Sequence, residues 1–468
     1  NSPARVKHYL TREVPGTGGV LRMREEDFFV EEIPAYDPCG EGEHLYLLVE
    51  KKNLSTGHLV RLIAKHYGVA RTAVGVAGLK DRRAVTRQMI SVHLPGARKA
   101  QQALAGGGAG PGAELAPFET AGAHVLWSDW HTNKLRQGHL KGNRFIIRIR
   151  DVEPAKVVHA HRSLMMLSAS GVPNRFGPQR FGHLQHNHLV GRALLKFDHE
   201  AAVRELLGPR EGMDEGEGMG GLGEAEGGAG AGGLGGGWGA QRAAREAFAR
   251  GEYQAAMELL PRAAHTERRV LDRLHRGGTA RDAVRAIEAL DYLFFLHAAQ
   301  SAVFNTVLEK RLSAGTFDRL LEGDLAFRHD NGAVFAVDGA VLAEARTPER
   351  LAKFEVSPSG PMWAAGMTRA GGAVDEAEVA ALAEWGLTPE DLERYAARAG
   401  RGEGALAGAR RALRVPLMYP DIESGVDEHG SYIKCVFELP RGSFATAVME
   451  EIMKSGGNEV GGGGEEEE

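Results

Sequence analysis

Residues 78–88, GLKDRRAVTRQ, set one carboxylate among four cations directly after a glycine. Positive neighbours hold the carboxyl group of Asp81 in its ionised form, because they stabilise its negative charge. The residue types alone leave two interpretations open. Asp81 either pairs with Lys80 or Arg82 to fix the turn, or serves as an anionic catalyst for a polyanionic substrate.

The stretches around this segment predict regular structure. Residues 73–78 form a short apolar run, and residues 86–94 alternate between polar and apolar side chains, so both predict strands. Further upstream, residues 44–53 predict a strand and residues 54–69 a helix. Asp81 is therefore expected on a loop between two strands, where a rigid scaffold presents it.

The composition sets the broad class of the protein. The 468 residues are 43% hydrophobic, enough for two domains, and no run approaches the length of a membrane span. The two cysteines, Cys39 and Cys435, are too few for a disulfide framework or a zinc site. We expect a reducing compartment, the nucleus or the cytoplasm, and no membrane contact.

The net charge of −5 is distributed unevenly. Residues 211–226 hold six acids and residues 459–468 hold five, with no base in either segment. Without these eleven acids the net charge becomes about +6, and local charge governs binding to RNA. Residues 131–150, HTNKLRQGHLKGNRFIIRIR, hold six Lys or Arg and no acid. Within them the alternation from residue 144 predicts a strand with one basic face.

The rest of the chain predicts a mixed organisation. Glycine-rich or acidic composition predicts loops or disorder at 104–116, 211–239 and 458–468. Helical periodicity predicts helices over 281–313, 375–386 and 388–399, and the basic run 408–416 predicts a helix end. After this run the sequence predicts two strands, a turn and a helix.

Together with its surroundings, the opening stretch resembles the TruD family of pseudouridine synthases, whose signature is G-x-K-D-x-x-A-x-T-x-Q. Five further segments resemble the family in the same order: REEDFFVEEIP (24–34), LKGNRF (140–145), PNRFGPQRFG (173–182), SAVFNTVLEKRL (301–312) and LPRGSFATAVMEEI (439–452). One such match is weak evidence, but six ordered matches are very improbable by chance. The glycine-rich segments depart from the family pattern as insertions and remove no motif.

The resemblance implies an α+β fold. A catalytic domain with a mixed, mainly antiparallel sheet is expected from residues 1–171 plus 413–457, interrupted by an inserted α/β TRUD domain at 172–412. The cleft between the two domains is expected to hold RNA. We expect a monomer, and the acidic insertions and the LPRGSFAT ending favour a eukaryotic or archaeal-like branch.

The family converts uridine to pseudouridine in RNA, and this chemistry requires no cofactor and no metal. The resemblance implies tRNA as substrate, with uridine 13 as the target, and in the eukaryotic branch small nuclear RNA and messages as well. The alternative is a non-catalytic RNA-binding or RNA-folding protein on the same scaffold. The intact Asp81 favours the enzyme, because a degenerate relative is free to lose that carboxylate.

The same resemblance implies roles for individual residues. Asp81 is expected as nucleophile or base, Glu32 and Lys80 as its neighbours, and Asn143 with Phe145 as the holders of a flipped uracil. Lining of the cleft is implied for Asn174, Gln179, Arg180 and Phe181. Alternatives remain open for several of these side chains. Glu32 can be a surface carboxylate, Lys80 a brace of the turn, Phe145 plain core, and segment 173–182 a structural hinge.

One histidine-rich stretch invites a metal interpretation. Residues 182–192, GHLQHNHLVGR, contain His183, His186 and His188, but no cysteine or acid completes a ligand set. We therefore expect no metal and assign these histidines to the surface or to contact with RNA.

Overall fold

The computed structural model describes residues 3, 6, 8–80, 84–97, 118–209, 238–399 and 405–454. Four earlier predictions therefore lie outside the described residues: those for Asp81, for 104–116, for 211–237 and for the tail 458–468. Residues 238 and 239, predicted as part of a loop, instead begin a helix, α6.

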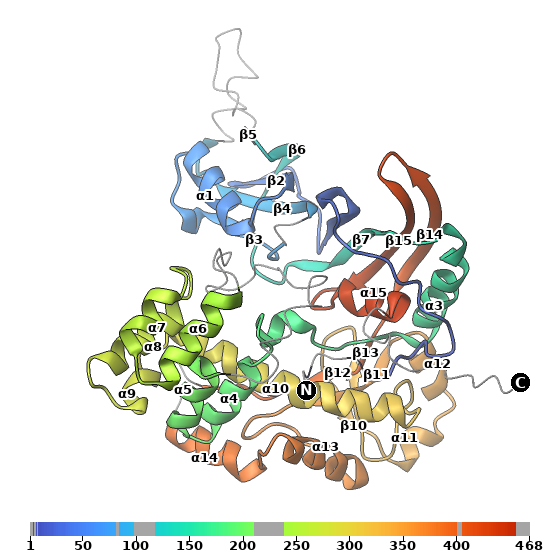
Figure 1. The fold of residues 1–468 in the computed structure, drawn as a ribbon. Coiled ribbons are helices and arrows are strands. Elements are labelled where there is room, and N and C mark those ends of the chain that lie inside the picture. Colours follow the sequence, from blue (N-terminus) through green and yellow to red (C-terminus); the bar gives the residue numbers. More distant parts are fainter. Residues whose placement is uncertain are drawn as a thin grey trace, which may run out of the picture.

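A nine-stranded sheet runs in the order β14-β15-β7-β1-β4-β2-β6-β5, with β3 paired to β4 (Figure 1). β1 and β4 are parallel, and the other pairings are antiparallel. Both ends of the chain contribute strands, because β14 and β15 return from the far side of the helical region. The strands are β1 (Phe28–Pro34), β2 (His44–Lys52), β3 (Val74–Val76), β4 (Val85–His93), β5 (Glu119–Thr120), β6 (Ala123–His131), β7 (Leu140–Arg150), β14 (Met418–Asp427) and β15 (Gly430–Pro440).

Helices cover the sheet in two places. Near β2 and β4, α1 (Thr56–His66) buries Leu59 and Ile63 against the strands. Around β7 and β15, α3 (Val157–Ser170) and α15 (Ala445–Met453) close a second apolar cluster. The alternating pattern of the strands explains this arrangement, since one face of each strand is apolar.

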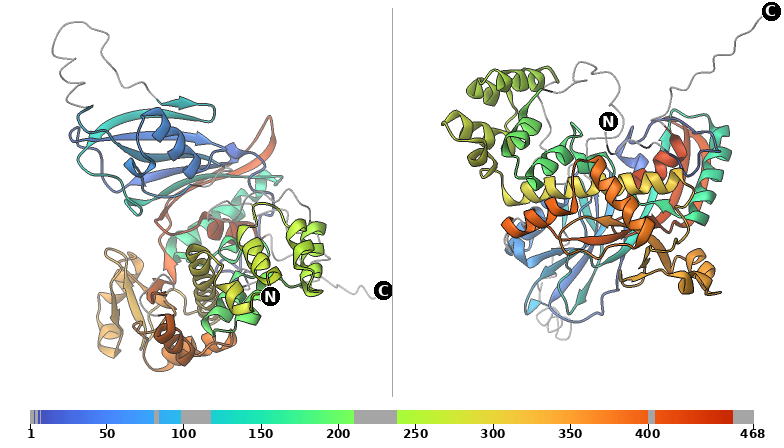
Figure 2. Two further views of the ribbon diagram at one scale, coloured as in Figure 1. Left: turned by 90° about the vertical axis from the view of Figure 1, so that its left-hand side faces the viewer. Right: turned by 90° about the horizontal axis from the view of Figure 1, so that it is seen from below.

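The segment between β7 and β14 is mainly helical, and Figure 2 shows the long helix α10 running through its middle. Its helices are α4 (Asn187–Leu195), α5 (His199–Leu207), α6 (Trp238–Ala249), α7 (Tyr253–Leu259), α8 (His265–His275), α9 (Ala280–Val284), α10 (Ala289–Ser313), α11 (Gly339–Ala343), α12 (Thr347–Ala352), α13 (Gly372–Glu384) and α14 (Pro389–Ala399). A four-stranded sheet joins β9 (Leu325–Arg328), β10 (Val334–Ala336), β11 (Val356–Met362) and β12 (Ala409–Ala412), and β8 (Val172–Pro173) pairs with β13 (Arg414–Val415). The domain boundaries at 172 and 412 stay a prediction.

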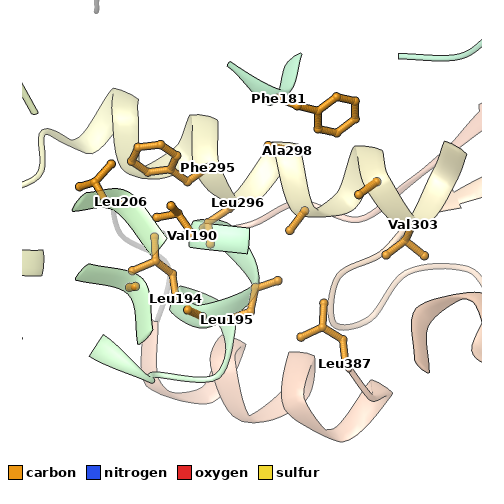
Figure 3. Packing of buried hydrophobic residues seen from close by; sticks show 14 of the residues in the cluster. Phe181, Val190, Leu194, Leu195, Leu206, Phe295, Leu296, Ala298, Val303 and Leu387 are labelled. Atoms are coloured by element: carbon orange, nitrogen blue, oxygen red, sulfur yellow. The ribbon is translucent and has the colours of Figure 1, made fainter. Parts of the chain in front are cut away.

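A large apolar cluster holds the helical part together. Val190 and Leu194 of α4 pack with Phe295 and Leu296 of α10 (Figure 3). Gly191 permits this contact, because a Cβ atom there would lie 2.0 Å from the carbonyl oxygen of Phe295. The two helix backbones can therefore approach more closely than any larger residue would allow.

Two further predictions of local structure were wrong. The expected helix 281–313 is two helices, α9 and α10, separated by a turn at 285–288. The basic run 408–416 forms β12 and β13 rather than a helix end, because strand pairing with β11 and β8 organises it.

Acids from elsewhere in the chain lie beside part of the basic face of β7. Arg150 is 3% exposed and pairs with Asp27 and Asp427. The sheet register also sets Arg144 opposite Glu31 of β1 and Glu438 of β15. Asp27 lies just before β1 and Asp427 lies on β14, so the 131–150 window could not show any of these acids. Within the described part of the chain, no helix is long and apolar enough to cross a membrane.

α15 carries a carboxyl group whose burial has a measurable consequence. Burial raises the pKa of Glu450 to about 7, and Glu451 adds to the rise while Arg175 opposes it. The folded protein therefore holds a proton that the unfolded chain releases above pH ~4.5. This contribution to stability is complete below that pH and is lost as the pH rises towards 7.

We expect Glu450→Gln to become more stable relative to wild type as the pH rises from 5 to 8, by up to about 3 kcal/mol. Urea unfolding at both pH values measures the difference. Glu376→Gln, which changes an exposed carboxylate on α13, should show no such trend. A difference between wild type and Glu450→Gln that stays constant with pH would contradict the proposed protonation.

Candidate active site

Three predicted site residues meet where β1, β7 and the segment after β3 come together. Lys80 Nζ lies 2.9 Å from Glu32 Oε2 and donates a 2.8 Å hydrogen bond to Asn143 Oδ1. The sheet register pairs Glu32 directly with Asn143. The side chains of Glu32 and Lys80 are 1% and 6% exposed, so the ion pair is buried. The structure thus brings together residues that lie more than 100 positions apart in the chain.

The backbone at Lys80 is anchored as firmly as its side chain. The N–H of Lys80 donates to Thr56 Oγ1 at 3.0 Å, at the start of α1. The same hydroxyl donates to Oε1 of the fully buried Gln88 at 3.2 Å. Through its amide, Gln88 therefore braces the loop that carries Lys80. The residue before Asp81 is therefore fixed in place.

Glycine leaves room for the lysine of the ion pair. A Cβ atom at Gly78 would lie 3.2 Å from Lys80 Nζ, a tight contact, and 3.7 Å from Glu32 Oε2, an ordinary one. A larger residue would therefore require a small shift of the Lys80 ammonium, which gives the G-x-K spacing of the motif a modest steric reason.

Burial and charge act against each other at Glu32. Burial raises the pKa of this carboxyl group, because the low-dielectric interior disfavours the charged form, and Lys80 opposes the rise. The ionised form of Glu32 therefore depends on the neighbouring Lys80. Such a pair is costly to break, since either partner alone is a buried charge.

Phe145 lies two residues further along β7 and is 6% exposed. Its ring packs between Phe28, at a centroid distance of 6.5 Å, and Phe437, at 5.6 Å. The ring is thus part of the apolar cluster beneath the sheet. Contact with a base stays a prediction for this residue.

The other predicted site residues lie in a second group, on the 173–182 segment. Asn174 is buried and donates from Nδ2 to the carbonyl oxygen of Ala412 at 2.8 Å. Gln179 is exposed, whereas Phe181 is fully buried in the core of the helical part. Arg180 is half-buried, and its guanidinium lies 5.4 Å from the ring centroid of Phe176.

Sequence reasoning missed Arg411 and Phe176. Arg411 donates from Nη2 to Asn174 Oδ1 and to the carbonyl oxygen of Gly442, and its guanidinium lies 4.3 Å from the Phe176 ring centroid. The basic run around Arg411 was the available signal, but an incorrect helix prediction hid its place on a strand.

Backbone hydrogen bonds connect the two groups. Gly442, which accepts from Arg411, follows Arg441, and the N–H of Arg441 donates to the carbonyl oxygen of Lys141. Lys141 lies two positions before Asn143 on β7. The ends of β7 and β15 therefore join the Lys80–Glu32–Asn143 group to the 173–182 segment.

Two histidines of the histidine-rich stretch, His183 and His188, contact other side chains of the protein. His183 Nε2 lies 3.1 Å from Gln241 Oε1, and the His188 ring packs edge-on against Phe181 and Trp385. Among the described residues, no three His, Cys, Asp or Glu side chains form a group that could hold a metal ion.

Comparison with known proteins places these groups in a family context. The family described as "tRNA pseudouridine synthase D (TruD)" matches residues 6–218 and 238–452. A tRNA pseudouridine synthase D of Geobacter sulfurreducens is 40% identical over 451 residues, which cover 96% of this chain and 97% of the relative. That of Thermus thermophilus is 33% identical, over 95% of this chain and 92% of the relative.

A solved structure described as a TruD from Methanosarcina mazei has a TM-score of 0.74 and 26% sequence identity. The alignment covers 96% of each chain. The Geobacter and Thermus relatives are bacterial, so they do not support the expected eukaryotic or archaeal-like branch. The likeness extends over both the sheet and the helical part, and the predicted α+β class is confirmed.

Proposed function

This chain belongs to the family of tRNA pseudouridine synthase D (TruD), and from that premise we propose that it isomerises uridine 13 of tRNA with Asp81 as the catalytic carboxylate. The protein is a tRNA pseudouridine synthase, an isomerase whose substrate is RNA. The position of the uridine and the role of Asp81 are the parts that we propose. Asp81 lies outside the described residues, so support comes from its neighbours.

The single observation that carries the proposal is the buried group of Lys80, Glu32 and Asn143. A buried ion pair is a poor source of stability, because desolvation offsets most of its attraction. Because Lys80 directly precedes the signature aspartate, we infer that the group serves function rather than stability. The group fixes the chain at residue 80 and so limits where the next carboxylate can lie.

The reaction needs a carboxylate at the sugar. The N1–C1′ bond of the uridine breaks, the uracil turns, and its C5 bonds to C1′ while the proton on C5 is lost. We propose that the Asp81 carboxylate attacks C1′ or removes the proton from C2′. Both routes use an ionised aspartate and neither changes the oxidation state of the substrate.

Asn143 is suited to hold the uracil. Its Oδ1 accepts from Lys80, which orients the amide and leaves Nδ2 with no acceptor among the described residues. Nδ2 is then a donor for a uracil carbonyl oxygen. Phe145, on the same face of β7, supplies apolar surface beneath that amide.

Mapping of the product tests the position. We expect an unmodified tRNA transcript, treated with the protein, to show pseudouridine at position 13 by carbodiimide modification and primer extension. A transcript with cytidine at that position should show none. Pseudouridine at another position would contradict the proposed target while leaving the enzyme class intact.

A further inference from the structure

Two guanidinium groups share one aromatic ring at the junction between the sheet and the helical part. The guanidinium carbons of Arg180 and Arg411 lie 5.4 and 4.3 Å from the Phe176 ring centroid. Each also has a second ring nearby, Phe294 for Arg180 and Phe304 for Arg411, both at 5.6 Å. Stacking of this kind fixes the plane of a guanidinium while leaving its N–H donors at the edge.

The shared ring is itself held firmly. Asn305 of α10 accepts from the N–H of Phe176 at 2.9 Å and donates to its carbonyl oxygen at 2.8 Å. Phe304, the preceding residue, packs edge-on against the ring at 5.6 Å. Phe304 and Asn305, from the segment SAVFNTVLEKRL (301–312), thus position the Phe176 ring on which both arginines stack.

The two arginines have no counter-charge in the described structure. Burial lowers the pKa of Arg180 and lowers that of Arg411 to about 10, and in Arg411 the neighbouring Arg180 adds to the effect. Among the described residues, no carboxylate contributes to either shift. Within the described residues, the Arg180 side chain has no hydrogen-bond acceptor, and Arg411 uses only Nε and Nη2.

Neighbouring buried arginines behave differently. Arg175 pairs with Glu309, and Arg410 forms a two-point ion pair with Glu378 at 2.6 and 2.8 Å. Arg414 resembles Arg411 instead, since its described acceptors are neutral: Ser357 Oγ and two carbonyl oxygens. Arg175 and Arg410, in the same segments, therefore have the carboxylate partner that Arg180 and Arg411 lack among the described residues. Two adjacent cations without an anion repel each other, and this arrangement costs stability unless a ligand supplies the charge.

The arginine pair lies a short distance from the Lys80–Glu32–Asn143 group. Arg411 contacts Gly442, three residues after Leu439, and Leu439 pairs with Asn143 in the sheet. Three residues span at most about 11 Å. An anion at the pair therefore lies within a few nucleotides of the Lys80–Glu32–Asn143 group.

We propose that Arg180 and Arg411 together bind one backbone phosphate of the tRNA and so position the target nucleotide over the Lys80–Glu32–Asn143 group. This inference rests on the proposed function, since it takes RNA as the substrate. Arginine suits the task, because a planar guanidinium presents paired donors to phosphate oxygens.

Binding of an unmodified tRNA transcript by the full chain, measured over a range of salt concentrations, tests the site. Arg180→Gln and Arg411→Gln should each weaken binding about tenfold and reduce the slope of log K against log salt by about 1. Arg411→Lys retains the charge and should retain the slope with weaker binding. Since Arg180 loses no described hydrogen bond, Arg180→Gln should fold with an unchanged or higher unfolding temperature.

Arg398 offers a matched control. Its guanidinium lies 5.0 Å from the Phe197 ring centroid, but it is exposed, and no second arginine of the described residues stacks on that ring. Arg398→Gln makes the same change of charge and should alter neither affinity nor slope.

The outcomes separate the two proposals. An active wild type whose salt slope is unchanged in Arg180→Gln would overturn the phosphate site and leave the proposed function intact. A wild type that binds tRNA but forms no pseudouridine, with the slope reduced in the variants, would overturn the function and retain the site. Destabilisation of Arg180→Gln with an unchanged slope would assign the pair a structural role only.

Discussion

Lys80→Met is expected to destabilise the protein by about 3–5 kcal/mol at pH 8, because it leaves the buried Glu32 carboxylate without a counter-charge. Glu32 is 1% exposed, so water cannot replace the ammonium. Urea unfolding measures the loss. The Lys353→Met variant removes a lysine from an exposed pair with Glu349 and should cost less than about 1 kcal/mol.

The pH dependence adds a second check on Lys80→Met. Without Lys80 the pKa of Glu32 rises further, since burial remains and the opposing charge is gone. A folded pKa above the unfolded value favours the protonated protein, so the destabilisation should shrink as the pH falls towards 5. The double variant Lys80→Met/Glu32→Gln should regain most of the stability and remain inactive. Equal loss at pH 5 and pH 8 would contradict the buried pair.

Asp81→Asn is expected to lower the single-turnover rate of pseudouridine formation by roughly 10⁴-fold or more, because an amide neither attacks C1′ nor accepts a proton from C2′. The shape of the residue is nearly unchanged, so binding of tRNA should stay within about threefold of wild type, a difference below 1 kcal/mol. Quenched reactions with enzyme in excess give the rate, and filter binding gives the affinity. A large loss of affinity would indicate that Asp81 supports the loop rather than the chemistry.

Much of the fold follows from local sequence patterns. The alternation in 86–94 predicts β4 to within one residue, and the apolar spacing in 54–69 predicts α1 to within three. Thr388 and Asp391 at the start of α14 form a cap, with each backbone N–H bonded to the other's side chain. Such signals are local, so a single sequence suffices to read them.

The site is predictable only in part, because it depends on strand order. Nothing near Glu32 in the sequence shows that β1 lies between β4 and β7, yet this order brings Glu32, Lys80 and Asn143 together. The acids that pair with Arg150 of β7, Asp27 and Asp427, come likewise from distant parts of the chain. Arg411 was missed for a related reason, since a basic run near a glycine-rich segment resembles a helix end until strand pairing is known.

The most direct test of whether this protein isomerises uridine through Asp81 is the release of tritium from tRNA labelled at C5 of uridine. The C5 hydrogen leaves when the new C5–C1′ bond forms, so each isomerisation releases tritium. Wild type should release about one equivalent per tRNA, and Asp81→Asn none above background. Equal release by the two proteins would remove Asp81 from the chemistry. No release by wild type from a tRNA that it binds would contradict the isomerase itself.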